Sequence, residues 1–130
     1  MSLHLRGVKP AVGPDADALT RVPPAPRFLS AQARDEWKRV LPQLIARQII
    51  TRADLAGVES YCMAVGTVRQ IAEAFAAAGG LIDPKLFGVQ NRAMQTARQL
   101  AAEYGLTPTS RARIGSNTRE DDGDNPLAVG

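Results

Sequence analysis

Few residues of this sequence have the types and spacing that catalysis or metal binding requires. The single histidine, His4, lies among prolines and glycines, so no rigid element holds it beside a nucleophile. The neighbouring carboxylates Asp35 and Glu36 point in different directions on a helix, and solvation of a helix surface explains them. The single cysteine, Cys62, is interpreted as a small buried hydrophobe and allows no intramolecular disulfide.

Motifs for cofactors and metals are also missing from the sequence. It has no glycine-rich phosphate loop, no Cys/His metal spacing and no dinucleotide fingerprint. The acidic stretch "EDDGDN" lacks the full spacing and the closing glutamate of a calcium loop, so a solvated tail explains it. We therefore predict no catalytic residues, no metal and no cofactor, and we expect the chain not to be an enzyme.

Basic side chains form the first of two candidate interaction surfaces. They are interleaved with only two acids before residue 52, and several could lie along one solvent-facing side. Such side chains would contact DNA phosphates without choosing a base sequence. The alternative is an ordinary charged helix exterior. The candidate DNA-binding residues are Arg27, Arg34, Lys38, Arg39, Arg47 and Arg52.

The charge is unevenly distributed along the chain. The net charge is +3, yet residues 105–119 carry three arginines and no acid, and residues 120–130 carry four acids and no base. A basic segment followed by an acidic tail suits nucleic-acid contact with a self-screening or partner-binding end. Ordinary solubility is the competing explanation.

Composition and length favour one all-α domain. Hydrophobic residues make up 45% of the chain, but aromatic residues only 5%, and alanine supplies much of the apolar fraction. Five prolines before residue 30 predict a flexible arm over 1–29, with "RVPPAPRFL" as a stiff polyproline spacer. The start has no signal-peptide pattern, and no apolar run is long enough for a membrane helix, so we expect a soluble intracellular protein.

Periodicity and capping residues predict the helices of the domain over 30–115. Ser30 is a natural N-cap for an amphipathic helix, in which Pro42 predicts a kink or two shorter helices meeting near Leu41. The pair Thr51 and Asp54 resembles a capping box at the start of a second helix.

The second helix should end at Gly79 and Gly80, and Pro84 should lie at or just before the start of a third helix that Gly105 ends. These two helices predict an antiparallel hairpin. Thr107 should cap a last short helix, with Leu106 and Ile114 packing back on the hairpin. Residues 116–130 are predicted to be a disordered acidic tail.

A surplus of small apolar positions forms the second candidate surface. One small monomer cannot bury every apolar helix face, so burial between subunits is the economical solution, and a marginally stable single bundle is the alternative. The positions are Ala53, Ala56, Gly57, Ala64, Gly66, Ala74, Ala76, Ala77, Ala78, Ala101 and Ala102.

The order of these motifs resembles the phage terminase small subunits, whose members share a Pro-rich approach, "LS" before a Trp-bearing helix, a helical hairpin and a closing "LGLTP-S-RAR" signature. The matching stretches are "PPAPRFLSAQARDEWKRVLPQLIARQIITRADLAGVESYC" and "ARQLAAEYGLTPTSRARIG", although the turn "GGLIDPK" is shorter than the usual loop of the family. The residues that carry the resemblance as a structural or oligomer signature are Trp37, Thr107, Pro108, Ser110, Arg111 and Arg113.

The resemblance implies a ring-forming, non-catalytic subunit in the cytoplasm of the host cell, a bacterium that is infected by the phage or carries it as a prophage. It would bind viral double-stranded DNA and deliver it to the large subunit, which holds the ATPase and nuclease. The alternative function is a small helical scaffold that binds only protein. Arg111 and Arg113 could make an intersubunit salt bridge, contact a DNA phosphate or stay exposed, and we favour the first.

Overall fold

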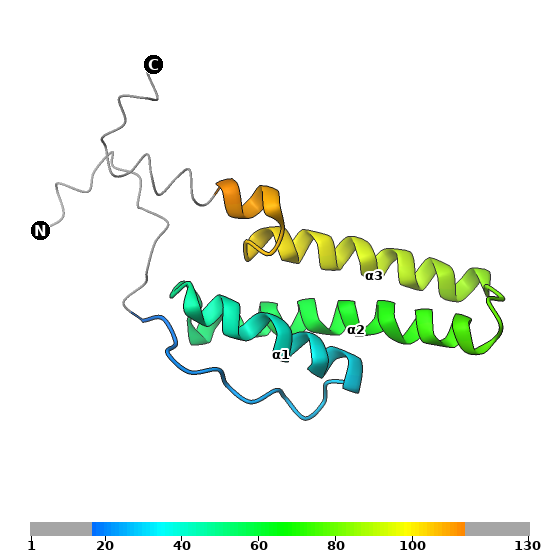
Figure 1. The fold of residues 1–130 in the computed structure, drawn as a ribbon, viewed down its shortest axis with the longest axis horizontal. Helices are drawn as coiled ribbons and strands as arrows, with labels where there is room; N and C mark the ends of the chain where they lie inside the picture. Colours follow the sequence, from blue (N-terminus) through cyan, green and yellow to red (C-terminus); the bar gives the residue numbers. More distant parts are fainter. Residues whose placement is uncertain (1–16, 114–130) are drawn as a thin grey trace, which may run out of the picture.

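The computed structural model describes residues 17–113, which contain helices and connecting segments but no strand (Figure 1). The helix α1 spans Ala31–Ala46, the short 3-10 helix η2 spans Arg52–Asp54, α2 spans Leu55–Ala77 and α3 spans Pro84–Glu103. Residues 108–113 are also helical. The predicted all-α class is therefore confirmed. Ile114 and the acidic tail lie outside the described residues, as does the part of the arm before residue 17.

The long helix α2 is the centre of the fold. The helices α1 and α3 both pack on α2 and do not approach one another. The turn between α2 and α3 makes the predicted antiparallel hairpin, and its turn end projects beyond α1 (Figure 1). Because α1 is shorter than α2, it does not cover the last turn of α2 at the hairpin end (Figure 1).

The first helix begins where its cap predicts. The hydroxyl of Ser30 accepts a hydrogen bond from the Ala33 amide at 3.1 Å, and α1 then continues without a break through Pro42. The alternative of two helices meeting near Leu41 is therefore wrong. Pro42 is exposed, so the carbonyl that loses its helical partner can face water, while buried Leu41 and Leu44 hold the helix against the core.

Residues 17–29 pack along the helices, although the sequence predicts a flexible arm here. The indole Nε1 of Trp37 donates to the Pro23 carbonyl at 2.9 Å, and the Leu19 amide donates to the Ile50 carbonyl at 2.8 Å. Leu29 is buried, and Leu19 and Ala25 pack against the core. Packing therefore begins before the predicted boundary at residue 30.

Side-chain caps begin the hairpin helices, and the sequence predicts the one formed by Thr51 and Asp54. Asp54 accepts from the Thr51 amide at 2.8 Å, which closes the predicted capping box around η2. Asp83 caps α3 by accepting from the Lys85 and Leu86 amides, with Pro84 as the first helical residue. The left-handed glycines that end the two helices are Gly79, Gly80 and Gly105, with φ of +72°, +89° and +67°.

The core lies between α1 and the first half of α2. Its fully buried members include Val40, Leu44 and Val58. Cys62 is also fully buried, as predicted, and burial raises the pKa of its thiol to about 12. A thiol in this state is neutral and protected, so Cys62 acts as a packing residue.

A glycine permits the close approach of α1 to α2. A Cβ at Gly66 would lie 2.9 Å from both the Cβ and the backbone nitrogen of Ala33. Backbone atoms cannot move aside as the end of a flexible side chain can, so the two helices would have to separate. By contrast, a Cβ at Gly88 in α3 would meet only the Arg92 guanidinium, at an ordinary 3.7 Å.

We therefore expect Gly66→Ala and Gly88→Ala to change stability in opposite directions. Alanine favours a helix over glycine by about 1 kcal/mol, so Gly88→Ala should raise the free energy of unfolding by up to that amount. Gly66→Ala should lower it by about 1–3 kcal/mol, because the overlap with Ala33 outweighs the helix preference. Urea unfolding followed by circular dichroism measures both. A stabilised Gly66→Ala would contradict the close approach.

Candidate nucleic-acid interface

Two of the six predicted DNA-binding residues bind the protein's own backbone. Arg34 donates from Nε to the Leu29 carbonyl at 3.2 Å and from Nη2 to the Arg27 carbonyl at 2.9 Å, which fixes the segment that leads into α1. Arg47, at the end of α1, donates from Nη1 to the Tyr104 and Gly105 carbonyls at 3.3 and 2.7 Å. Arg34 and Arg47 therefore have structural roles.

Arg47 joins the ends of two helices whose backbones have no close contact with each other. Its acceptors are carbonyls at the C-terminal end of α3, where unpaired carbonyls favour a cation. Burial of the guanidinium, and after it the charge of Arg111, lower the pKa of Arg47. Arg111 itself donates to the Leu106 carbonyl at 3.4 Å, so the closing segment brings two cations to this end of the fold.

A third candidate, Arg39, belongs to a cluster around a buried carboxylate. Glu36 has no exposed surface, which corrects the expectation that this carboxylate lies solvated on the helix surface. Its Oε1 accepts from Arg39 Nε at 2.9 Å and from Arg69 Nη2 at 3.0 Å. Its Oε2 accepts from Arg39 Nη2 and from the Tyr61 hydroxyl, both at 2.5 Å. We call these four residues the Glu36 cluster.

The Glu36 cluster keeps its carboxylate ionised. Burial alone would raise the pKa of Glu36, but the hydrogen bonds of Arg39 and Tyr61 and the charges of Arg39 and Arg69 outweigh it and lower that pKa. Burial, followed by the hydrogen bond and the charge of Glu36, raises the pKa of Tyr61, so its hydroxyl stays a donor. The carboxylate therefore has a complete set of partners despite its burial.

The other three candidates are exposed cations. Arg27 precedes α1, Lys38 lies on its outer face and Arg52 lies in η2. Within the described part of the chain, no hydrogen bond or ion pair engages the side chains of Arg27, Lys38 and Arg52. The six predicted residues therefore do not form one uniform stripe. Two are structural, Arg39 is held by Glu36, and the remaining three are available to an external anion.

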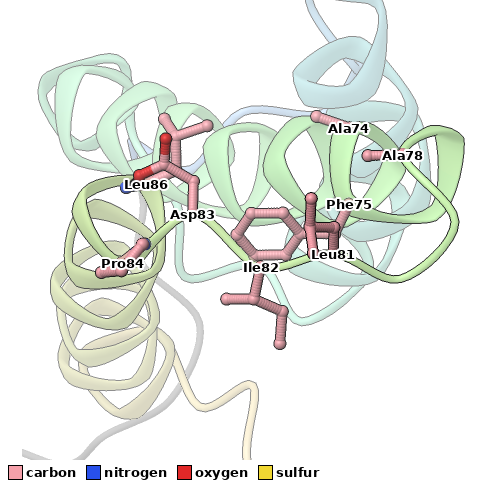
Figure 2. A pocket seen from close by; sticks show the side chains of 8 residues that line it. All are labelled: Ala74, Phe75, Ala78, Leu81, Ile82, Asp83, Pro84 and Leu86. Atoms are coloured by element: carbon pink, nitrogen blue, oxygen red, sulfur yellow. Dashed lines mark hydrogen bonds between the residues drawn. The ribbon is translucent and has the colours of Figure 1, made fainter.

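A hydrophobic surface covers the turn end of the hairpin. Leu81 and Ile82 are 75% and 57% exposed, and Phe87 is 49% exposed. Beside them lies a cavity of about 300 Å³. Figure 2 shows Phe75, Leu81 and Ile82 gathered at its centre. The lining residues are Ala74, Phe75, Ala78, Leu81, Ile82, Asp83, Pro84 and Leu86.

The small apolar residues divide between the core and the exposed surface, and some of the exposed ones lie near the turn end. Ala64, Gly66 and Ala101 are buried within the chain, so the prediction of burial between subunits is wrong for them. Gly57 is partly buried beside the Tyr104 hydroxyl. Exposed in the structure are Ala53, Ala56, Ala74, Ala76, Ala77, Ala78 and Ala102, of which Ala74 and Ala76–Ala78 lie near the turn end.

The closing signature is built as a cap. The Thr107 hydroxyl accepts from the Ser110 amide, and the Ser110 hydroxyl accepts from the Thr107 amide, each at 3.1 Å. Pro108 begins the helix at 108–113, Ser110 is buried, and Leu106 packs against the core. Arg111 and Arg113 are exposed, and their intersubunit salt bridge stays a prediction.

The described residues also bear on metal binding and membrane insertion. Residues 17–113 contain no group of three or more His, Cys, Asp or Glu side chains that could hold a metal ion. Within the same range, no helix combines the length and the apolar character needed to cross a membrane.

Comparison with known families decides the identity. The family model described as "Phage terminase, small subunit" matches residues 33–121, which is more than half of the chain. The chain belongs to this family. No curated protein and no solved structure matches it significantly. Membership supports a role of this terminase small subunit in phage DNA packaging, and the small subunit of a terminase is generally the non-catalytic one.

Sequence reasoning missed Arg69 and the role of Glu36 in this terminase small subunit. Position 36 belongs to the buried stripe of α1, next to Trp37 and one turn from both Ala33 and Val40. A carboxylate on such a stripe must have partners, because an unpaired buried charge is strongly unfavourable. The helical periodicity contained this signal, but it could not show which cation on α2 would pair with Glu36, a role that Arg69 fills in the structure.

We expect Glu36→Gln to lower the stability of this terminase small subunit by about 2–3 kcal/mol, because it weakens hydrogen bonds to charged partners that can partly turn to water. The folded-state pKa of Glu36 is lowered, so its contribution exists above the unfolded pKa and is lost as pH falls through the folded value. Urea unfolding across acidic pH should therefore show a smaller pH dependence for Glu36→Gln than for the wild type. Asp35→Asn, an exposed neighbour, should change stability by less than about 0.5 kcal/mol, and an equal loss in both variants would contradict this role.

Proposed function

We propose that this chain is the non-catalytic small subunit of a phage terminase, which binds viral double-stranded DNA and delivers it to the large subunit in the cytoplasm of the host cell. The family match over residues 33–121 carries the proposal. The exposed cations Arg27, Lys38 and Arg52 support DNA contact. They suit phosphates, which exposed cations contact without choosing a base sequence.

A single chain offers few such contacts, so the proposal includes assembly into a ring of identical subunits. Repetition of a few phosphate contacts around a ring raises the effective concentration of each further contact without new chemistry. A ring needs a contact between two different patches of the same chain. The hydrophobic turn end of the hairpin is one suitable patch, because it is apolar, hollowed and uncovered in the single chain.

The first test of this function separates available from structural cations. The wild type should bind a short random-sequence duplex with an affinity that falls as salt rises. Lys38→Gln and Arg52→Gln together should lower the salt slope by about two, since each lost phosphate contact removes about 0.9, and should leave unfolding unchanged. Arg47→Gln is the control: it should destabilise the fold by about 1–2 kcal/mol through its two carbonyl contacts. Fluorescence anisotropy over a salt series measures the slope. Absence of DNA binding by a correctly assembled wild type would favour the protein-binding scaffold.

The second test addresses assembly. Phe87→Glu places a charge on the hydrophobic turn end, and it should lower the native mass toward that of the single 13.9 kDa chain. The exposed Phe87 is not part of the core, so helix content should be retained. Gln99→Glu adds the same charge at an exposed position nearer the other end of α3 and should leave the mass unchanged. Native mass spectrometry decides, and a wild type that runs as a monomer at micromolar concentration would overturn the ring.

A further inference from the structure

Two arginines from different helices converge on one buried carboxylate. Arg39 Nε and Arg69 Nη2 both donate to Oε1 of Glu36, at 2.9 and 3.0 Å. These two nitrogens are therefore no more than about 6 Å apart, which is close enough for both guanidinium groups to reach oxygens of a single phosphate. Arg39 and Arg69 lie on neighbouring helices that the core holds together, so their spacing is set by the fold.

Both guanidinium groups remain partly open to solvent. Their side chains are 56% and 43% exposed, whereas Glu36 is fully buried beneath them. Arg39 uses Nε and Nη2 on the carboxylate, and Arg69 uses Nη2. The remaining nitrogens, Nη1 of Arg39 and Nε and Nη1 of Arg69, have no acceptor among residues 17–113. Donors that the carboxylate does not use are thus available to a second anion.

The charges of the cluster favour that second anion. Two guanidinium groups face one carboxylate, and the Tyr61 hydroxyl stays neutral because its pKa is raised, so one positive charge is left over. Further along the same seam between α1 and α2, the Glu73 carboxylate accepts from Gln32 Nε2 at 2.8 Å. The Glu73 carboxylate therefore bounds the positive charge of Arg39 and Arg69 on the side toward the hairpin turn.

We propose that Arg39 and Arg69 clamp one phosphate of the DNA backbone, and that Glu36 is the residue that positions them. The clamp rests on the proposed DNA-binding function and names a residue, Arg69, that the sequence did not suggest. The hydrogen bonds to Glu36 fix long side chains before DNA arrives, so less side-chain freedom is lost on binding. A free arginine at the surface has no such advantage.

The first experiment compares two substitutions of equal charge. Arg69→Gln should weaken binding of a random-sequence duplex by at least about threefold per phosphate contact and reduce the salt slope by about 0.9. Arg98→Gln removes an exposed cation from α3, whose backbone has no close contact with α1, and it should have a much smaller effect. Circular dichroism and native mass are recorded for both variants.

The second experiment separates positioning from net charge. Glu36→Gln makes the protein more positive by one charge, so simple electrostatic attraction would tighten DNA binding. The clamp predicts the opposite, because arginines released from the carboxylate lose their fixed spacing. Affinity is compared at one low salt concentration, at which circular dichroism confirms that the variant is folded. Arg69→Gln provides the independent result if Glu36→Gln unfolds.

The outcomes distinguish the clamp from the function on which it rests. A wild type that binds DNA, with Arg69→Gln behaving as Arg98→Gln, overturns the clamp alone. A tighter Glu36→Gln complex also overturns it. A fall in native mass for Arg69→Gln shows that the pair instead holds a carboxylate of another subunit. No DNA binding by the assembled wild type overturns the proposed function together with the clamp.

Discussion

The arrangement of this small domain depends on one buried carboxylate. Glu36 enters the core from α1 and accepts hydrogen bonds from Tyr61 and Arg69, which lie about two turns apart on α2. A group with these partners cannot slide along α2 by a turn without leaving a buried charge unpaired. The position of α1 along α2 is therefore fixed, and with it the meeting of Ala33 and Gly66, where the helices approach closely.

The same constraint decides which surfaces stay open. With α1 held against the first part of α2, the indole of Trp37 faces the Pro-rich segment, which it binds through the Pro23 carbonyl. The last turn of α2 and the first turns of α3 lie beyond α1 at the hairpin end (Figure 1). Side chains at this end, such as Leu81 in the turn and Phe87 in α3, remain exposed. An apolar end of this kind on a small domain is typical of an interaction surface rather than of a core.

The sequence predicted local features of this fold better than the roles of its charges. The caps at Ser30, Thr51 and Thr107 and the stop at Gly105 depend on neighbours within a few residues, so residue types and spacing suffice to find them. The packing of residues 17–29 was missed because Leu19 pairs with Ile50, far along the chain, and no local pattern encodes that contact.

Long side chains are hardest to predict because their partners are set by tertiary contacts. Arg34 and Arg47 look like surface cations in the sequence, yet they donate hydrogen bonds to the backbone carbonyls of residues 27, 29, 104 and 105. Arg69 was passed over because an isolated arginine on a long apolar helix has no distinguishing neighbour. Its role depends on α1, which packs on α2 and brings Glu36 within hydrogen-bond distance of Arg69.

The division of the cations links the proposed DNA contact to the proposed assembly. After the structural arginines are set aside, one subunit keeps three exposed, unengaged cations among the predicted residues, together with the shared charge of Arg39 and Arg69. Each phosphate contact of this kind is weak and sensitive to salt. Strong DNA binding, if this chain has it as proposed, would require repetition of these few contacts through an interface that does not use the same residues. The hydrophobic hairpin end meets that requirement, because it lies beyond α1 and contains none of these cations.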